Sequence, residues 1–168
     1  MNQFYSSNIT DSIAVLSESE SQHLRVLRIK EGDALMIVDG VGHQYLGELS
    51  KLHKKASEVT IRETINQMEQ PPLLDVAIAP TKSNDRYEWF LEKATEIGVR
   101  NIYPFISYHS ERKVIKPERM EKVILSAMKQ SLRLWLPQLH PIVSFRGLID
   151  QCRSSNDAKY IAHLKTNQ

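Results

Sequence analysis

The chain has 168 residues, 41% of them hydrophobic and 25% charged, which is long enough for one medium domain or two small ones and too apolar for a disordered chain. Its single cysteine excludes an internal disulfide, no apolar run approaches the roughly 20 residues of a membrane span, and the amino terminus lacks the layout of a signal peptide, so we predict a cytoplasmic protein. The net charge of +2 is unevenly distributed, because residues 1–70 carry 7 Lys and Arg against 10 Asp and Glu, whereas residues 71–168 carry 15 against 10.

The first part of the chain has the pattern of a small β domain. Short strand-like runs at residues 35–38, 45–49 and 59–65 alternate with turn signals at Asp39, Gly40 and Gly42. Ser17 and Glu20 have the spacing of a capping box, which predicts one short helix or turn at residues 21–29. We therefore expect a partly closed barrel with one helical insertion.

Three cations gather around the end of that short helix. Arg25, Arg28 and Lys30 are spaced three and two residues apart, so they surround one helical turn and its exit. This arrangement suits contacts with phosphates better than the reading of bases. His23 beside them fits an RNA contact and a packed or capping group equally well.

A composition change at residues 67–72 marks the predicted domain boundary, because Pro71 and Pro72 can continue neither a helix nor a central strand. We divide the chain into domains at 1–70 and 71–168. The second domain alternates strands with helices, and the strands are predicted at 73–79, 101–107, 142–143 and 160–164. One helix begins at Asp85, where Glu88 completes a capping box, a second begins at Pro117, and a short third helix covers 147–152. Gly98 is placed to end the first helix, and Pro137 to stop the second at residue 136. The alternation predicts a parallel sheet whose first strand is buried on both faces.

The turn at residues 82–86 is the strongest candidate for a binding site. It lies between the first strand of the second domain and a helix, and in open α/β sheets such turns lie at the ligand-binding edge. Lys82 and Arg86 flank the helix amino terminus and reinforce its attraction for anions. The alternative is a surface salt bridge with Asp85 or Glu88.

A basic run follows in the second domain. Against Glu111, Glu118 and Glu121, it carries the seven cations Arg112, Lys113, Lys116, Arg119, Lys122, Lys129 and Arg133. The excess of positive charge suits a polyanion, and we favour RNA over a merely solvated helix face. Arg112, Lys113 and Lys116 are the predicted RNA contacts of this run.

One polar helix edge carries the catalytic candidates. Ser126, Gln130 and Arg133 recur at i, i+4 and i+7, which places them on one face of the predicted helix. Gln130 offers both a donor and an acceptor, as the edge of a nucleobase requires, and Arg133 can hold a phosphate or stabilise negative charge. The alternative for Arg133 is a simple interaction with the helix dipole.

Other chemistries lack their motifs. The six histidines form no pair at metal-ligand spacing, and one cysteine cannot complete a zinc site, so we expect no metal. No Gly-x-Ser-x-Gly elbow and no glycine-rich phosphate loop occurs, which leaves hydrolase, nucleoside-triphosphatase and dinucleotide-binding hypotheses without support.

Three segments together resemble the RsmE-type 16S ribosomal RNA uridine N3-methyltransferases of the SPOUT class. They are residues 23–33 (HLRVLRIKEGD), residues 82–86 (KSNDR) continuing to 92–99 (EKATEIGV), and residues 127–133 (AMKQSLR) with Pro137. The resemblance implies an α+β protein of two domains, in which a small PUA-like β-barrel that binds RNA precedes a knotted, Rossmann-like SPOUT domain. It also implies S-adenosylmethionine as cofactor, the small ribosomal subunit as partner, and a homodimer.

The chain departs from the family pattern at its end. The family continues into a Gly-Pro-Glu-Gly loop and a Leu-Arg-x-Glu-Thr-Ala segment that form the cofactor pocket, and neither occurs here. We therefore expect a fragment that is inactive alone, with His163 and Leu164 as its nearest cofactor-binding candidates. The competing hypothesis is a non-catalytic RNA-binding or ribosome-assembly module. A third, a small-molecule-binding α/β domain, predicts no salt-dependent affinity for RNA.

Overall fold

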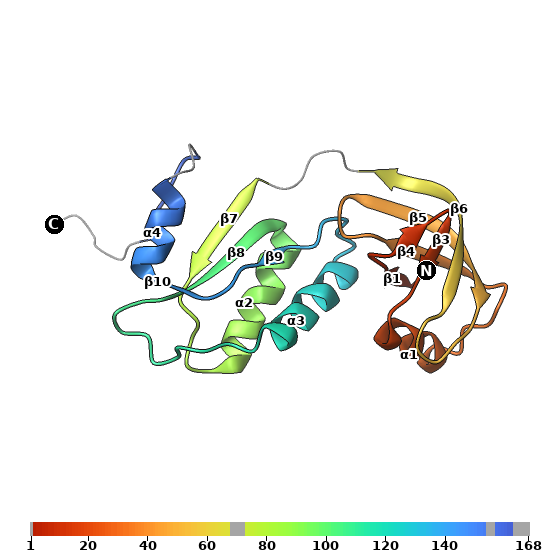
Figure 1. Cartoon of the computed structure of the whole chain (residues 1–168), viewed down its shortest axis with the longest axis horizontal. Helices are drawn as coiled ribbons and strands as arrows, with labels where there is room; N and C mark the ends of the chain where they lie inside the picture. The colour runs from red at the N-terminus through yellow and green to blue at the C-terminus, as the bar shows by residue number, and fades with distance from the viewer. Residues whose placement is uncertain (1, 68–72, 154–156, 163–168) are drawn as a thin grey trace.

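The computed structural model describes residues 2–67, 73–153 and 157–162. They form two units, which we call the β unit (residues 2–67) and the α/β unit (residues 73–153). The β unit lies at one end of the molecule and α4 at the other, with α2 and α3 between them (Figure 1). The expected α+β class with a barrel-like and a parallel sheet is confirmed. The predicted linker at 68–72 lies outside the described residues, so the domain boundary stays a prediction.

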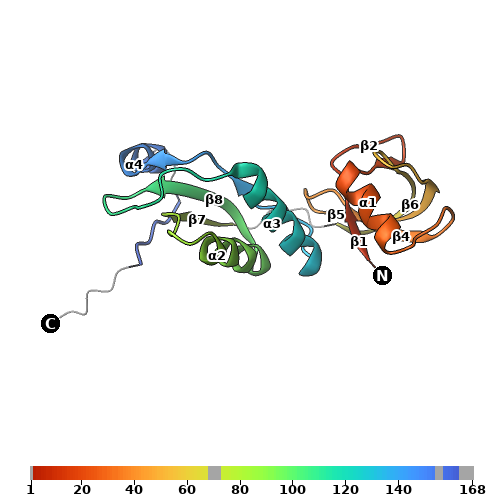
Figure 2. The same ribbon diagram turned by 90° about the horizontal axis from the view of Figure 1, so that it is seen from below.

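The β unit is a curled half-barrel of six strands with one helix packed into it (Figure 2). The strands are paired in the order β1-β4-β5-β6-β3-β2, in which β1 and β4 are parallel and the other pairs antiparallel. The elements are β1 (Gln3–Tyr5), β2 (Ile9–Thr10), β3 (Ile13–Val15), α1 (Glu18–Val26), β4 (Ala34–Val38), β5 (His43–Lys51) and β6 (Glu58–Gln67). Its hydrophobic core includes Phe4, Leu16, Leu24 and Ile37.

The helix α1 begins as its capping signal predicts. The hydroxyl of Ser17 accepts a hydrogen bond from the backbone N–H of Glu20 at 3.3 Å. The Glu20 side chain does not return to the helix start, as a capping box would require, and instead accepts from the backbone N–H of Tyr5 at 3.2 Å. The helix ends three residues earlier than predicted, because Arg28 takes a left-handed backbone conformation (φ 58°).

The α/β unit is a parallel sheet in which α2 packs against β8, and α3 packs against α2 and β9. In the described part of the chain the sheet has the order β10-β8-β7, with β9 pairing alongside β8. The elements are β7 (Leu74–Ile78), α2 (Asn84–Ile97), β8 (Val99–Ile106), α3 (Pro117–Gln130), β9 (Gln138–Leu139), β10 (Val143–Ser144) and α4 (Phe145–Arg153). None of the helices in the described residues has the length and apolar character of a membrane span.

Four details of this unit differ from the sequence-based expectations. Ser83, not Asp85, occupies the N-cap of α2, so the predicted capping box there is wrong. Leu73 and Leu74 are 82% and 51% exposed, so β7 is not buried on both faces, because it is the last strand of the described sheet. Residues 160–162 carry no strand, and the rest of that predicted strand lies outside the described residues.

The fourth difference is the end of α3. The helix stops at Gln130, six residues before its predicted end, because Leu132 adopts a left-handed conformation (φ 54°). Gly98 does end α2 as predicted, with φ 94° and its N–H bonded to the carbonyl of Ala94.

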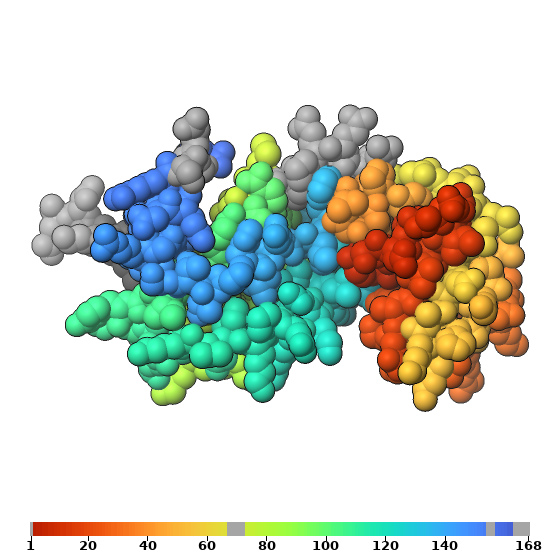
Figure 3. All heavy atoms as spheres, in the orientation of Figure 1, coloured from red at the N-terminus to blue at the C-terminus, as the bar shows by residue number. Residues whose placement is uncertain are grey.

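The segment after α3 binds the two units together. The N–H of Gly42 donates to the carbonyl of Leu134 at 3.0 Å, and the N–H of Leu136 donates to the carbonyl of Gly40 at 2.9 Å. The ammonium of Lys129 lies 2.6 Å from the carboxylate of Glu20, whose side chain is only 5% exposed. The space-filling view shows the cyan-blue atoms that follow α3 against the orange atoms of the β unit (Figure 3).

We expect Lys129→Met to destabilise the chain by about 2 kcal/mol, because the Glu20 carboxylate then stays buried without its cation. Lys122→Met is the matched control, since Lys122 lies exposed on the same helix. The measurement is urea unfolding, in which the Glu20→Gln/Lys129→Met double variant recovers part of the loss. Equal midpoints for Lys129→Met and Lys122→Met would contradict the role assigned to this pair.

Candidate nucleic-acid interface

The turn that precedes α2 is fastened to the basic segment that precedes α3. The guanidinium of Arg112 donates to the side-chain oxygen of Asn84 and, at 2.6 Å, to the carbonyl of Lys82. The ammonium of Lys82 lies 2.8 Å from the carboxylate of Glu111. The turn and the segment were separate candidates in the sequence, and the structure places them side by side at the carboxyl ends of β7 and β8. Lys82 pairs with Glu111 and not with Asp85 or Glu88, the two partners that the sequence suggested.

Several cations of the predicted basic surface are already engaged by the protein. Arg112 holds the turn, and Lys129 pairs with Glu20. Arg119 lies 2.6 Å from Glu88 of α2. A polyanion that approached these groups would compete with internal contacts. These pairings could not be predicted from the sequence, because the partners are remote along the chain.

The remaining cations are free to meet a ligand. Within the described residues, no side-chain hydrogen bond or ion pair occupies the exposed cations Arg86, Lys113, Lys116 and Lys122. The same is true in the β unit, where Arg25, Arg28 and Lys30 are exposed around the exit of α1. The hydrogen bonds at this exit use the backbone instead, since the N–H of Arg28 donates to the carbonyl of Arg25 at 3.0 Å and that of Lys30 to the carboxylate of Asp33 at 2.8 Å. The His23 ring, 5.7 Å from that of Phe4, packs at the edge of the β-unit core.

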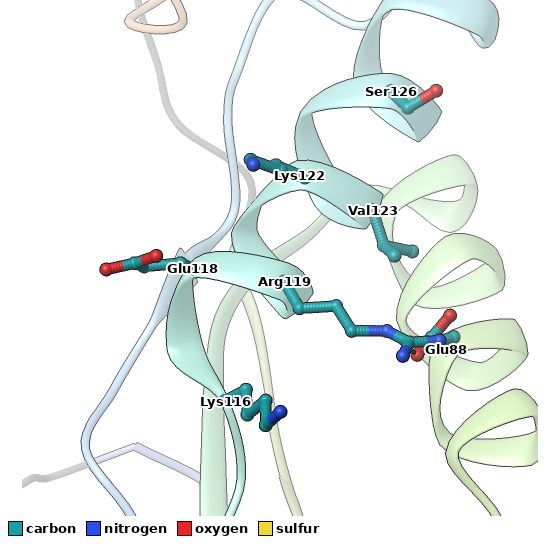
Figure 4. Close-up of a pocket in the computed structure, with 7 residues that line it drawn as sticks. All are labelled: Glu88, Lys116, Glu118, Arg119, Lys122, Val123 and Ser126. Atoms are coloured by element: carbon teal, nitrogen blue, oxygen red, sulfur yellow. Dashed lines mark ion pairs between the residues drawn. The ribbon is translucent and has the colours of Figure 1, made fainter.

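An open pocket of about 450 Å³ lies beside α3 (Figure 4). It is lined by Glu88, Lys116, Glu118, Arg119, Lys122, Val123 and Ser126. Figure 4 shows Arg119 reaching across to Glu88 on α2, whereas Glu118 and Lys122 point to the other side of α3. The pocket therefore offers Lys116 as an unpaired cation beside a neutralised pair, which suits a phosphate at its rim better than a reacting group inside it.

The two catalytic candidates do not share a helix face. Gln130 is the last residue of α3 and is exposed, whereas Arg133 lies beyond the left-handed Leu132 and points to α2. Its guanidinium donates to the carbonyl of Glu96 at 2.9 Å and to that of Ile97 at 3.1 Å. Arg133 therefore satisfies carbonyls that the last turn of α2 leaves unpaired. The expected common face of Ser126, Gln130 and Arg133 is wrong, and the catalytic roles stay predictions.

A second polar cluster joins β7 to β8. Arg100 donates to the two carboxylate oxygens of Asp75 at 2.8 and 2.7 Å, and Asn101 donates to Asp75 at 3.0 Å. Burial raises the pKa of Asp75, but these hydrogen bonds outweigh it and hold the pKa below its ordinary value. The His140 ring lies 3.0 Å from Asn101 and stacks on Tyr103, and burial lowers the pKa of His140. Since each charge here has a partner, the cluster fixes the register of the two strands.

A second hollow of the α/β unit lies away from the carboxyl edge of its sheet. The hollow beside β7, about 680 Å³, is lined by the Asp75 and Arg100 pair with apolar groups such as Leu148. It lies along β7 and the first half of β8, whereas ligands of open parallel sheets bind beyond the carboxyl ends of the strands. The predicted cofactor contacts His163 and Leu164 lie outside the described residues. Among those residues, no group of three or more His, Cys, Asp or Glu side chains is placed to hold a metal ion.

Two family models match the chain one after the other. A model described as an RNA methyltransferase PUA domain matches residues 16–62, and a model described as an RNA methyltransferase domain matches residues 68–168. The curated ribosomal RNA small subunit methyltransferase E of Synechocystis is 28% identical over 150 residues, which cover 85% of this chain and 48% of that protein. The chain thus spans about half the length of this relative.

Solved structures show the same similarity. A probable rRNA-methyltransferase from Porphyromonas gingivalis is 37% identical, with a TM-score of 0.77 over 89% of this chain and 63% of that one. A ribosomal RNA small subunit methyltransferase E from Neisseria gonorrhoeae, solved with bound S-adenosyl methionine, is 27% identical, with a TM-score of 0.78 over 90% of this chain and 66% of that one.

We expect Arg133→Ala to lower the free energy of unfolding by about 1 kcal/mol, because two carbonyls at the end of α2 lose their donor. Gln130→Ala is the matched control, since its exposed side chain makes no hydrogen bond in the described part of the chain. Arg133→Lys keeps the charge but not the planar fork, so it falls between the two. Urea unfolding measures all three, and an unchanged midpoint for Arg133→Ala would remove the structural role.

Proposed function

This chain belongs to the family of RNA methyltransferases that includes the ribosomal RNA small subunit methyltransferase E proteins, and from that premise we propose that it is the RNA-facing part of an enzyme that methylates N3 of a uridine in 16S ribosomal RNA. The enzyme uses S-adenosylmethionine and acts on the small ribosomal subunit. It works in the cytoplasm as a homodimer.

The proposal rests on the observation that one part of the basic surface holds the fold together, whereas its other cations are exposed and unpaired in the described part of the chain. The turn at residues 82–84 is held in place by Arg112, and the exposed cations Arg86, Lys113 and Lys116 surround it without partners among the described residues. Unpaired lysines are strongly hydrated point charges, and they gain most from phosphates, which release counterions when they are neutralised. This arrangement supports an RNA backbone along the carboxyl edge of the sheet.

Methylation at N3 sets a requirement that the catalytic candidates have to meet. The N3 of uracil carries a proton at neutral pH, so the site must favour the deprotonated imide by aiming donors at its oxygens. Gln130 is exposed at the end of α3 and has a donor and an acceptor free for a base edge. For Arg133 the proposed role requires the guanidinium to exchange the carbonyl of Ile97 for a uracil oxygen.

We further propose that these 168 residues do not transfer a methyl group by themselves. The chain spans 48% to 66% of the three relatives described above, and the hollow beside β7 lies away from the carboxyl edge at which open parallel sheets bind ligands. The same facts favour the second candidate function, a non-catalytic RNA-binding or assembly module. The two candidates share the RNA surface and differ only in methyl transfer.

The test of methyl transfer is made in the organism that produces this protein. We expect 3-methyluridine, measured by mass spectrometry of nuclease-digested small-subunit RNA, to disappear when the gene is disrupted and to return with the intact gene. A gene carrying Gln130→Ala should restore the mark only partly. If the mark is unchanged by disruption while the purified chain binds RNA, the non-catalytic module is the correct function.

We expect the Lys113→Ala/Lys116→Ala double variant to bind a single-stranded fragment of small-subunit RNA more weakly. The slope of log affinity against log salt should become shallower by about 1.4, since each phosphate contact on a single strand contributes roughly 0.7. The Lys113→Arg/Lys116→Arg variant is the control, because it keeps both charges. An unchanged slope for the alanine variant would show that these lysines are merely solvated.

A further inference from the structure

The connection between β8 and α3, which we call the β8–α3 loop (residues 107–116), carries an aromatic side chain with no cover. Figures 1 and 2 both show this loop projecting from the α/β unit at the end far from the β unit. Tyr108 is 96% exposed, and Val114 is 74% exposed. A large ring that no part of the fold covers adds little to stability, so it is available for contact with a partner.

The backbone of the loop is held by hydrogen bonds and a buried side chain, although Tyr108 and Val114 are exposed. The N–H of Ser107 donates to the hydroxyl of Ser110 at 2.8 Å, and the N–H of Ser110 donates to the carbonyl of Ser107 at 3.1 Å, which closes a tight turn around Tyr108. Further along, Arg112 fastens the loop to the start of α2, and Ile115 is buried in the core of the α/β unit. Because these anchors fix the loop before binding, ordering Tyr108 on a ligand costs little conformational entropy.

The chemistry of the loop combines rings and positive charge. The rings of Tyr108 and His109 lie edge to face with their centroids 4.9 Å apart. The exposed cations Lys113 and Lys116 follow within the same loop. Its one acid, Glu111, is paired with Lys82. Proteins bind single-stranded nucleic acid by combining exposed aromatic rings, on which bases stack, with unpaired cations, which contact the phosphates.

Other occupants fit the loop less well. A second copy of this chain, related by a two-fold axis, would bring the lysines of two such loops toward each other, and like charges in a contact oppose association. A double-stranded RNA offers backbone but no base face, because its bases are stacked on each other and its deep groove is closed to side chains. A single strand or an unpaired loop offers both the base and the phosphates.

From this geometry we propose that Tyr108 is a stacking site for an unpaired base of the RNA, with Lys113 and Lys116 on the adjoining phosphates. The proposal rests on the proposed function, because it names a contact within the same RNA surface. It adds a stacking contact with a base to the charges around the β8–α3 loop. It also places that contact at the end of the molecule away from the β unit, so the bound RNA extends along the whole carboxyl edge of the sheet.

The experiment compares Tyr108→Ala with Tyr108→Phe in the 168-residue chain. The probe is a single-stranded oligoribonucleotide from small-subunit RNA that carries 2-aminopurine, whose fluorescence is quenched when it stacks. We expect Tyr108→Ala to bind roughly fivefold more weakly or worse and to lose the quenching, since removal of one stacking ring has an effect of this order. Tyr108→Phe should keep both, because it keeps the ring.

The salt dependence separates this contact from the charges around it. Tyr108→Ala removes no charge, so its affinity should fall while its salt slope stays at the parent value. An exposed side chain also leaves the urea midpoint unchanged, which excludes unfolding as the cause.

Three results would overturn the proposal. Parent-like affinity and quenching in Tyr108→Ala would remove the stacking site while leaving the RNA surface intact. A loss of self-association in sedimentation, with RNA affinity unchanged, would assign the ring to a contact between copies of this chain. Failure of the parent chain to bind the probe at low salt would reject the proposed function itself, and the stacking site with it.

Discussion

A single buried carboxylate, that of Glu20, determines how the two units are joined. One oxygen accepts the backbone N–H of Tyr5 at the end of β1, and the other lies 2.6 Å from the ammonium of Lys129 near the end of α3. A buried carboxylate without such partners would carry a large desolvation cost, so each unit supplies what the other requires. Glu20 occupies the capping-box position of α1, yet its side chain contacts β1 and Lys129 of the other unit instead of the helix start.

The segment after α3 turns that single contact into a rigid connection. The left-handed Leu132 ends the helix and lets the chain run back along the β unit, where Leu134 and Leu136 make backbone hydrogen bonds to Gly42 and Gly40. Between them, Arg133 reaches in the opposite direction to the last carbonyls of α2. A side chain at Gly40 would be strained by the left-handed backbone there (φ 76°), and its Cβ would lie only 3.0 Å from the Cβ of Leu136. One short segment therefore sets the distance between the β unit, α2 and the end of α3.

Local patterns predicted the elements of this fold better than their ends and partners. Short strand-like runs between turn signals located the three long strands of the β unit, and Ser17 and Gly98 located one helix start and one helix end. The apolar pattern of α3 continues past residue 130, so the sequence predicted a helix up to Pro137. Leu132 breaks that pattern because the tertiary hydrogen bonds of the following segment outweigh one more turn of helix. No local pattern contains that information.

The same limit applies to the candidate site. The sequence showed which residues are charged, but not which of them are paired in the fold. All four arginines between residues 100 and 133 make fixed contacts, and these are Arg100, Arg112, Arg119 and Arg133. Three of the four lysines in that stretch make none in the described structure, and these are Lys113, Lys116 and Lys122. The planar fork of Arg can hold carbonyls and carboxylates in a defined geometry, whereas Lys is a mobile, hydrated charge.

Because the free charges of this stretch are lysines, the features of an RNA that the surface can recognise are limited. Lysines that contact phosphates position an RNA strand, but they carry no information about its sequence. The four arginines between residues 100 and 133, which could bind a base edge through two hydrogen bonds, instead bind carbonyls, an amide oxygen and carboxylates of the protein. In the proposed complex the exposed ring of Tyr108 would stack on any unpaired base, whereas the free amide of Gln130 offers a hydrogen-bonding pattern that can select one. Lys113, Lys116 and Lys122 lie between these two groups in the sequence, so an RNA that reached both would follow the lysines, with its path set by the charges and its base choice by the amide.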